Sequence, residues 1–560
     1  GSGGSGRNKI YSVISGVGGV TYGKIGNKTM TIYSANTYTG DTKFNYTTGS
    51  NNGVHIANAD AWKYSTVYLN STRTDVRKGW TVVSGGSINF GGLAGDATNW
   101  RWQNKQVTFG YNNQDTTFSG TVSQYNNDGY DLVKVGTGTT TFSNTSSNAH
   151  QDDVNGINVQ AGKVILSGNW GRNNDSNGNF NIESGATLEI DSSINNSFDG
   201  VLSGAGTLLL GGSGTQTFSG NNTFSGIINI ADGGFKAEHN NALGSVTSVT
   251  SSGGRISTAS SITLPSLIVS GNVQLDSGIT TTGAQTYTSD VLVASGTRAS
   301  PVEFNTTNSD IEFGGTLKGK GNAKARSLTI DAGTGDVTFG DRVGYAFNGE
   351  NFNANNTADS FYKMTVTAGT TTIKGDVMTY EEQTYNSNID VGSTGSNGTT
   401  RTLLSMDPKV IINGNVNDTI TNTHTLVAKA IAVRRDGITP DTPDVTYNGT
   451  IGRSKKLAGY SGVTGYQVVS KNYGVIDTDT SFGSVTGGTQ TNGTVASSSS
   501  SSKRSSQSNG RKTEKSANAV AKSAQTTIAD AGKNLIATLF GGGPSGGGRK
   551  FSKSIEVVMQ

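Results

Sequence analysis

Residues that could carry chemistry are few and widely scattered. Residues 543–547 (GPSGG) match the G-x-S-x-G pattern of a serine nucleophile, but they lie in a glycine-rich stretch without the strand–turn–helix context that such a serine needs. Residues 18–24 (GGVTYGK) imitate a phosphate-binding loop, but Ile25 stands where a Ser or Thr would hold magnesium. The adjacent carboxylates Glu381 and Glu382 would point to opposite faces of a strand, which is poor geometry for acid–base catalysis. We therefore expect no catalytic residue and no enzyme activity.

Metal and cofactor sites are not indicated either. The chain has no cysteine, which excludes disulfides and thiolate ligands. The four histidines lack ligand spacing, so we expect structural or surface roles for them: His55, His150, His239 and His424. No G-G-x-G-x-D calcium repeat occurs.

Tryptophans gather near the start of the chain. Trp62, Trp80, Trp100 and Trp102 are four of the five, and Arg101 lies between the last two. One interpretation is a cap whose aromatic side chains cover the first coil of a repeat fold. The other is a platform for carbohydrate or another partner, because aromatic faces stack on sugars and Arg reinforces such contacts.

Composition favours many short strands joined by turns. The 560 residues include 80 glycines but only 6 prolines, which argues against collagen and proline-rich disorder. Only 32% are hydrophobic and 15% charged, which is compatible with a thin core and too little charge for typical disorder. No run of 18 apolar residues indicates a membrane-spanning helix. Missing cysteines also fit a protein that crosses a periplasm unfolded.

Short alternating segments recur along most of the chain, for example 187–190 (TLEI), 227–230 (IINI), 327–330 (SLTI) and 364–367 (MTVT). Period-two alternation bounded by Gly, Asn, Asp or Ser is typical of strands. A sandwich or barrel could use such strands, but constant strand density and internal similarity favour a solenoid. The sequence therefore predicts an all-β fold, a right-handed parallel β-helix of about twenty coils of roughly 20 to 25 residues each.

Two kinds of internal repeat support this prediction. Residues 36–40 (NTYTG) recur as 222–226 (NTFSG), and the Q-T-Y segment at Gln285 recurs at Gln383, 98 residues later. Residues 204–244 resemble the autotransporter-associated β-strand repeat, although Asp41 and Ile227 stand where that repeat usually has glycine. Residues 266–391 are similar to the repeats of filamentous-haemagglutinin-type surface proteins.

These resemblances imply a secreted bacterial passenger at the outer cell surface or outside the cell, exported with the help of an outer-membrane transporter. They imply adhesion or a structural fibre as the function, with a cell-surface or matrix ligand such as carbohydrate as the partner. A polysaccharide-active enzyme and a toxin passenger are the less favoured alternatives. Nucleic-acid binding has only a basic tail in its favour, so we expect none.

The last part of the chain differs in character. Ten Lys or Arg and three Asp or Glu follow position 502, apolar residues recur at helical spacing over about 513–540, and residues 551–559 (FSKSIEVVM) read as a strand. The strand could cap its own solenoid, or it could add to the open edge of a neighbouring copy through Phe551, Ile555, Val557 and Val558 and so build a head-to-tail filament.

The expected organisation has five parts. They are a flexible N-terminal linker (1–9), a capping region (10–110), solenoid repeats (111–492), a serine-rich basic linker (493–512) and a C-terminal helix, glycine linker and terminal strand (513–560).

Overall fold

The computed structural model describes residues 8–479 except for short internal segments, the longest of which are 71–85, 144–153, 345–357 and 435–443. It divides the chain into two compact units, 1–498 and 499–560. The predicted linker 493–512, the helix 513–540 and the strand with Phe551, Ile555, Val557 and Val558 lie outside the described residues, as do 543–547.

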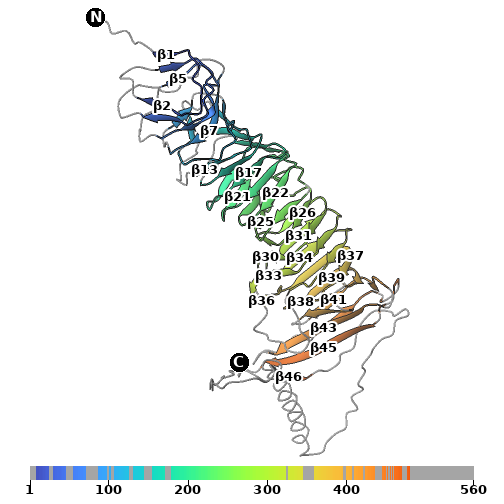
Figure 1. Ribbon diagram of the computed structural model, residues 1–560. Helices are drawn as coiled ribbons and strands as arrows, with labels where there is room; N and C mark the ends of the chain where they lie inside the picture. Colours follow the sequence, from blue (N-terminus) through green and yellow to red (C-terminus); the bar gives the residue numbers. More distant parts are fainter. Residues whose placement is uncertain are drawn as a thin grey trace, which may run out of the picture. The chain divides into compact units, whose positions relative to one another are not determined.

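The described part of the first unit is an all-β parallel β-solenoid of about 13 turns, and it contains no helix (Figure 1). This confirms the predicted fold class, while the right-handed winding stays a prediction. Nearly all strand pairs are parallel, and β33–β36 and β45–β46 are antiparallel pairs. Coil lengths are less uniform than expected: the register partners Leu267 and Gln285 of neighbouring coils are 18 residues apart, whereas Asn417 and Ser454, which a hydrogen bond joins, are 37 apart.

The longest sheet has nineteen strands, and it extends through most of the described solenoid. In spatial order they are β10 (Thr116–Phe118), β13 (Thr139–Phe142), β15 (Lys163–Leu166), β17 (Thr187–Ile190), β20 (Thr207–Leu210), β22 (Ile227–Ile230), β24 (Val249–Ser251), β26 (Leu267–Ser270), β28 (Ile279–Thr281), β29 (Gln285–Tyr287), β31 (Val302–Thr306), β32 (Ile311–Phe313), β34 (Leu328–Asp331), β35 (Val337–Phe339), β37 (Met364–Ile373), β39 (Gln383–Val391), β41 (Lys409–Ile412), β42 (Val416–Asp418) and β44 (Asp444–Tyr447).

Two further sheets form other faces of the later coils. The eight-stranded sheet contains β18 (Asn196–Phe198), β21 (Thr215–Phe218), β23 (Gly234–Ala237), β25 (Arg255–Thr258), β27 (Val273–Leu275), β30 (Val291–Val293), β33 (Leu317–Asn322) and β36 (Ala358–Asp359). The five-stranded sheet contains β38 (Val377–Thr379), β40 (Thr400–Ser405), β43 (Thr425–Arg434), β45 (Gly459–Val469) and β46 (Ile476–Asp479).

The N-terminal coils use three sheets. The nine-stranded sheet contains β19 (Leu202–Gly204), β16 (Asn179–Ile182), β14 (Val154–Val159), β12 (Tyr130–Lys134), β9 (Gln106–Phe109), β7 (Ser87–Ala94), β6 (Trp62–Tyr68), β4 (Thr42–Asn45) and β2 (Val20–Gly23). The others are β1 (Asn8–Ile10), β3 (Met30–Ile32) and β5 (Val54–Ile56), and the pair β8 (Trp100–Trp102) and β11 (Val122–Gln124). The region expected to cap the solenoid therefore contributes strands to the same parallel sheet as residues 106–204.

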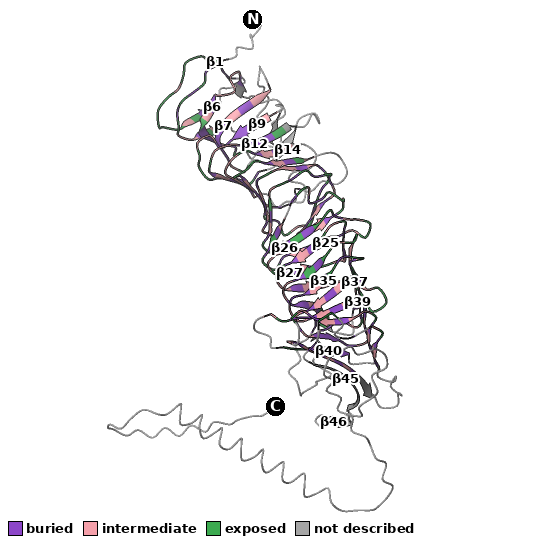
Figure 2. Ribbon diagram, turned by 90° about the vertical axis from the view of Figure 1, so that its right-hand side faces the viewer, coloured by how far each residue is buried: buried purple, intermediate pink, exposed green. Residues whose placement is uncertain are grey.

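Alternation along each strand builds the core. In β17, Leu188 and Ile190 are fully buried, while Thr187 and Glu189, which alternate with them, are half-buried. Figure 2 shows this alternation of buried and intermediate residues along many strands. Because coils stack in register, buried side chains of similar type lie above one another. The ring centroids of Phe198 and Phe218 are 5.3 Å apart, and those of Phe218 and Phe235 are 5.0 Å apart. Burying each such side chain stabilises the fold by about 1.5–3 kcal/mol.

The N-T-Y/F repeat has one structural role at both of its positions. The side-chain oxygen of Asn222 accepts a hydrogen bond from the Leu202 N–H of one neighbouring coil at 2.8 Å, and its amide donates to the Ala242 carbonyl of the other at 2.7 Å. Asn36 joins Ile14 and Ala61 in the same way, at 2.9 and 3.0 Å. Each asparagine thus links three consecutive coils, beside backbone hydrogen bonds such as that from the Thr223 N–H to the Leu202 carbonyl.

The glycine that ends this repeat is required by close backbone approach. A Cβ at Gly226 would lie 2.0 Å from the Gly206 carbonyl oxygen, and one at Gly40 would lie 2.4 Å from the backbone of Gly18. Such distances are far inside van der Waals contact, so the coil could stack only after the backbone shifted. The repeat motif therefore encodes coil spacing.

The Q-T-Y repeat is also structurally equivalent at its two positions. Gln285 is fully buried, donates to the carbonyls of Ile279 and Asn305 at 3.0 and 2.9 Å, and accepts from the Tyr287 hydroxyl at 3.1 Å. Gln383 does the same with Val377, Leu404 and Tyr385. Burial raises the pKa of both phenols. The repeat places a satisfied polar network inside the core.

Replacing Asn222 with Ala should therefore destabilise the solenoid by about 2–4 kcal/mol, because it leaves a buried N–H and a buried carbonyl without partners. The neighbouring Asn221 is exposed, and its side chain contacts only Asn241 among the described residues. Asn221→Ala is the matched control and should cost about 0.5 kcal/mol or less. Urea unfolding followed by circular dichroism measures both, and equal midpoints for the two variants would contradict the bridging role.

Candidate functional site

Of the four N-terminal tryptophans considered for a cap or a binding platform, Trp62 is the one whose side chain the structure describes. Trp62 is 1% exposed and packs in the core against the rings of Tyr22, Phe44 and Phe90, so it presents no ring to a ligand. It points inward because large aromatic side chains fill the interior of the first coils.

The remaining members of the predicted platform are placed only in part. Trp100, Arg101 and Trp102 form strand β8, with Trp100 opposite Val122 in β11, and their side chains lie outside the described residues. Trp80 also lies outside them.

Tyrosines take the exposed position instead. Ile10 and Ile32 are register partners in β1 and β3, so Tyr11 and Tyr33 follow at equivalent points of successive coils. Their rings stack with centroids 4.6 Å apart and planes 15° apart, and they remain 64% and 38% exposed. The Lys9 ammonium lies 5.9 Å from the centre of the Tyr33 ring.

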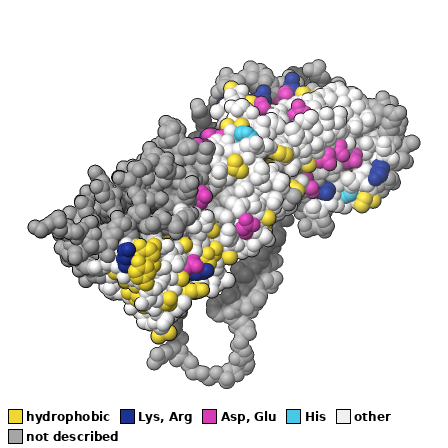
Figure 3. Space-filling model, turned by 90° about the horizontal axis from the view of Figure 1, so that it is seen from above, with side chains coloured by type: hydrophobic (Ala, Val, Ile, Leu, Met, Phe, Trp, Pro, Cys, Tyr) yellow, Lys and Arg dark blue, Asp and Glu magenta, His cyan; other side chains and the backbone are white. Residues whose placement is uncertain are grey.

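Two valines that follow Tyr11 in the chain are also exposed. Val13 is 58% and Val17 is 90% exposed, the latter being the highest value among the large hydrophobic side chains of the described chain. We call Lys9, Tyr11 and Tyr33, which the ring stack and the ammonium contact join, the N-terminal aromatic face. In Figure 3 most of the described surface in view carries no charged side chain, and a patch of hydrophobic side chains lies beside a basic one. The sequence signal for the face was a pair of tyrosines 22 positions apart, which is one coil length.

A second cluster joins a serine, a histidine and an aspartate at the later coils. Asp418 ends β42 opposite Val391 of β39, Ser393 follows β39, and His424 directly precedes β43. The His424 Nδ1 lies 2.5 Å from Asp418 Oδ1, and its Nε2 lies 2.9 Å from Ser393 Oγ. Asp418 and His424 are buried, whereas Ser393 is exposed.

Backbone groups hold Asp418 in its charged form. Its carboxylate accepts hydrogen bonds from the N–H groups of Ile420, Thr423 and His424 at 2.8 to 2.9 Å. Burial alone would raise the pKa of Asp418, but the hydrogen bonds from the His424 side chain and these N–H groups outweigh it and lower that pKa below its ordinary value. Sequence analysis expected a structural or surface role for His424, and it gave no signal for Ser393 or Asp418.

Lys134 is a further buried ionisable group. It is fully buried, and its ammonium donates to the carbonyls of Val135, Gly136 and Ala161 at 2.7, 2.8 and 3.4 Å. Burial lowers the pKa of Lys134 to about 8, while Asp115 opposes that shift. Since its hydrogen bonds join the turns of adjacent coils, this lysine serves the fold.

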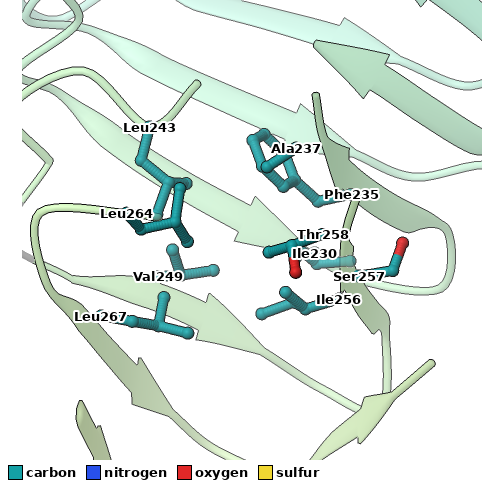
Figure 4. A pocket seen from close by; sticks show the side chains of 10 residues that line it. All are labelled: Ile230, Phe235, Ala237, Leu243, Val249, Ile256, Ser257, Thr258, Leu264 and Leu267. Carbon is teal, nitrogen blue, oxygen red and sulfur yellow. The ribbon is translucent and has the colours of Figure 1, made fainter. Parts of the chain in front are cut away.

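The solenoid interior offers no room for a ligand at the gap drawn in Figure 4. Ten side chains line it, including Ile230, Phe235, Leu243, Val249 and Leu264, and the space between them does not admit a water molecule. Among the described residues, no group of three or more His, Asp or Glu side chains could hold a metal ion. The described part also contains no apolar helix of membrane-spanning length.

Comparisons add no relative: a scan against protein-family models, a search of the curated proteins and a search of the solved structures each find no match to this chain.

Asp418 should make stability depend on acid pH. Its pKa is lowered in the folded state, so its contribution is complete above the unfolded value of about 4 and is lost as pH falls through the lower folded value. Asp418→Asn should cost about 2–4 kcal/mol at pH 6, and this difference from the parent chain should shrink below about pH 3. Urea midpoints at several pH values test this, and a difference that stays constant with pH would contradict it.

Proposed function

We propose that this chain is a bacterial cell-surface β-solenoid that acts outside the cell as an adhesin and binds carbohydrate at its N-terminal aromatic face. The observation that carries the proposal is the exposed stack of Tyr11 and Tyr33, with centroids 4.6 Å apart. Aromatic faces pack on the apolar face of a sugar ring. The nearby Lys9 ammonium supplies hydrogen-bond donors for sugar hydroxyls.

The surface and the interior of the solenoid also support a binding function. The described solenoid exposes mostly uncharged polar side chains and keeps its interior closed at the gap of Figure 4, so a partner would be met on the surface. The resemblance of residues 204–244 and 266–391 to repeats of secreted surface proteins favours a cell-surface or matrix ligand and export through an outer-membrane transporter.

The second candidate is a head-to-tail filament. Strands β1 and β2 each end their sheet, so each has a neighbour on one side only within the described chain. An unpaired strand edge can accept a further strand. The exposed apolar side chains of Val13 and Val17 lie in the segment between β1 and β2. The occupant would be the terminal segment around Ile555 of another copy.

Binding to a glycan array should require both exposed rings. Tyr11→Ala with Tyr33→Ala should weaken binding about tenfold or more, because two stacking faces are lost. Tyr11→Phe with Tyr33→Phe keeps the faces and should retain most of the affinity. Ile227→Ala, which removes a 53% exposed side chain of β22, is the control for general surface change and should bind as the parent does.

The same preparations separate the two candidates. If the parent chain binds glycans and both it and a truncation ending at Gly493 stay single particles in electron micrographs, adhesion stands alone. Fibres of the parent that vanish in the truncation, without glycan binding, would replace adhesion with the filament function.

A further inference from the structure

The cluster of Ser393, Asp418 and His424 has the connectivity of an activated nucleophile. Asp418 contacts Nδ1 of His424, so that nitrogen carries the proton and Nε2 is left to accept the hydrogen bond from the Ser393 hydroxyl. The serine faces solvent, whereas the other two side chains are about 1% exposed. Solvent access at the nucleophile and burial of its base and orienting carboxylate are what acyl transfer needs.

The loops around the serine fix this geometry. Val391 pairs with Asp418 across β39 and β42, and the Gly392 N–H is bound to the Ile373 carbonyl at 2.9 Å, so the chain leading to Ser393 is anchored. Within the described chain, the backbone N–H groups of Ser393 and Thr394 donate to no acceptor. A backbone N–H beside the nucleophile is the kind of donor that stabilises an oxygen developing negative charge there.

We propose that Ser393 is the nucleophile of a hydrolytic site for small carboxylic esters, with His424 as its general base and Asp418 as the positioning residue. Ser393 Oγ attacks the ester carbonyl carbon while its proton passes to His424 Nε2. The bond to the alcohol oxygen then breaks, and His424 returns the proton to that oxygen. Water, activated by His424, releases the carboxylic acid and restores the serine.

The substrate class follows from the setting. Ser393 is exposed, and a small acyl group needs few contacts beyond the nucleophile itself, whereas a peptide needs an extended binding surface. Esters also need less protonation of the leaving group than amides do, because an alcohol oxygen leaves more readily than an amine nitrogen. This inference is independent of the proposed adhesion, since the N-terminal aromatic face shares no residue with the cluster.

The test is the reaction of the full-length chain with a fluorophosphonate probe, followed by peptide mapping. Ser252 is an internal reference, because it is exposed and its hydroxyl donates only to the Ala231 carbonyl among the described residues. General-base assistance predicts labelling of Ser393 about 100-fold faster than Ser252. Ser393→Ala, a change at an exposed site, should abolish that fast label and the release of p-nitrophenol from p-nitrophenyl acetate.

The positioning role has its own readout. In Asp418→Asn the labelling rate at Ser393 should fall toward that at Ser252, while the Ser252 rate stays as in the parent. A rise at both serines would mean that the carboxylate only holds the coil together, and it would overturn the positioning role. If Ser393 in the parent chain labels no faster than Ser252, the hydrolytic site is ruled out without any variant having to fold.

Discussion

Stacking of one coil on the next in parallel register is the constraint on which the rest of this structure depends. Neighbouring strands lie about 4.8 Å apart, so every backbone group on a coil face is satisfied only if the next coil presents its partner at the same height. Register partners such as Thr187 and Thr207, or Leu188 and Leu208, therefore share a face. A slip of one residue would exchange the buried and outward faces, which ties the alternation of the sequence directly to the fold.

Side chains add to the backbone hydrogen bonds at the corners between sheets. Asn36 and Asn222 bond to both the preceding and the following coil. Inside the core, Gln285 and Gln383 each bond to a carbonyl six residues earlier and to a carbonyl about one coil later. Buried polar side chains are costly unless satisfied, so these repeats fix one spacing and one register. Loops outside this framework can vary without changing the register, and the carbohydrate site proposed at Tyr11 and the hydrolytic site proposed at Ser393 both lie next to strand ends.

The parallel β-solenoid could be predicted from the sequence because its signals are local. Alternation over residues 187–190 and the recurrence of N-T-Y/F and Q-T-Y each lie within one strand or one turn. The inward orientation of Trp62 could not be predicted, because composition does not set which face of β6 turns to the core. The structure has about 13 turns where twenty were expected, and insertions that set coil neighbours 34 and 37 residues apart, as at Thr370 and Ser454, leave no periodic signal in the sequence.

The candidate sites were harder to predict from the sequence, because they depend on contacts between distant residues and not on local signals. Ser393 and His424 are 31 residues apart, a separation set by loops with no repeating signal, so only the coil register brings them together. Sequence motifs indicated no catalytic residue, whereas the arrangement of these side chains in the structure is the basis of the hydrolytic site that we propose. The stack of Tyr11 and Tyr33 could have been predicted, because the two residues are one coil length apart in the sequence.

In-register stacking is tested most directly by engineered disulfides, because the chain has no cysteine of its own. Thr187 and Thr207 are register partners on the outward face, and Leu209 lies on the same face two positions further along β20. Cysteines at 187 and 207 should close a bridge under mild oxidation, whereas cysteines at 187 and 209 should stay reduced, because their Cα atoms lie roughly 8 Å apart. Mass spectrometry after alkylation reads the result. Equal bridging of both pairs, or bridging of the slipped pair alone, would contradict the coil register on which this account depends.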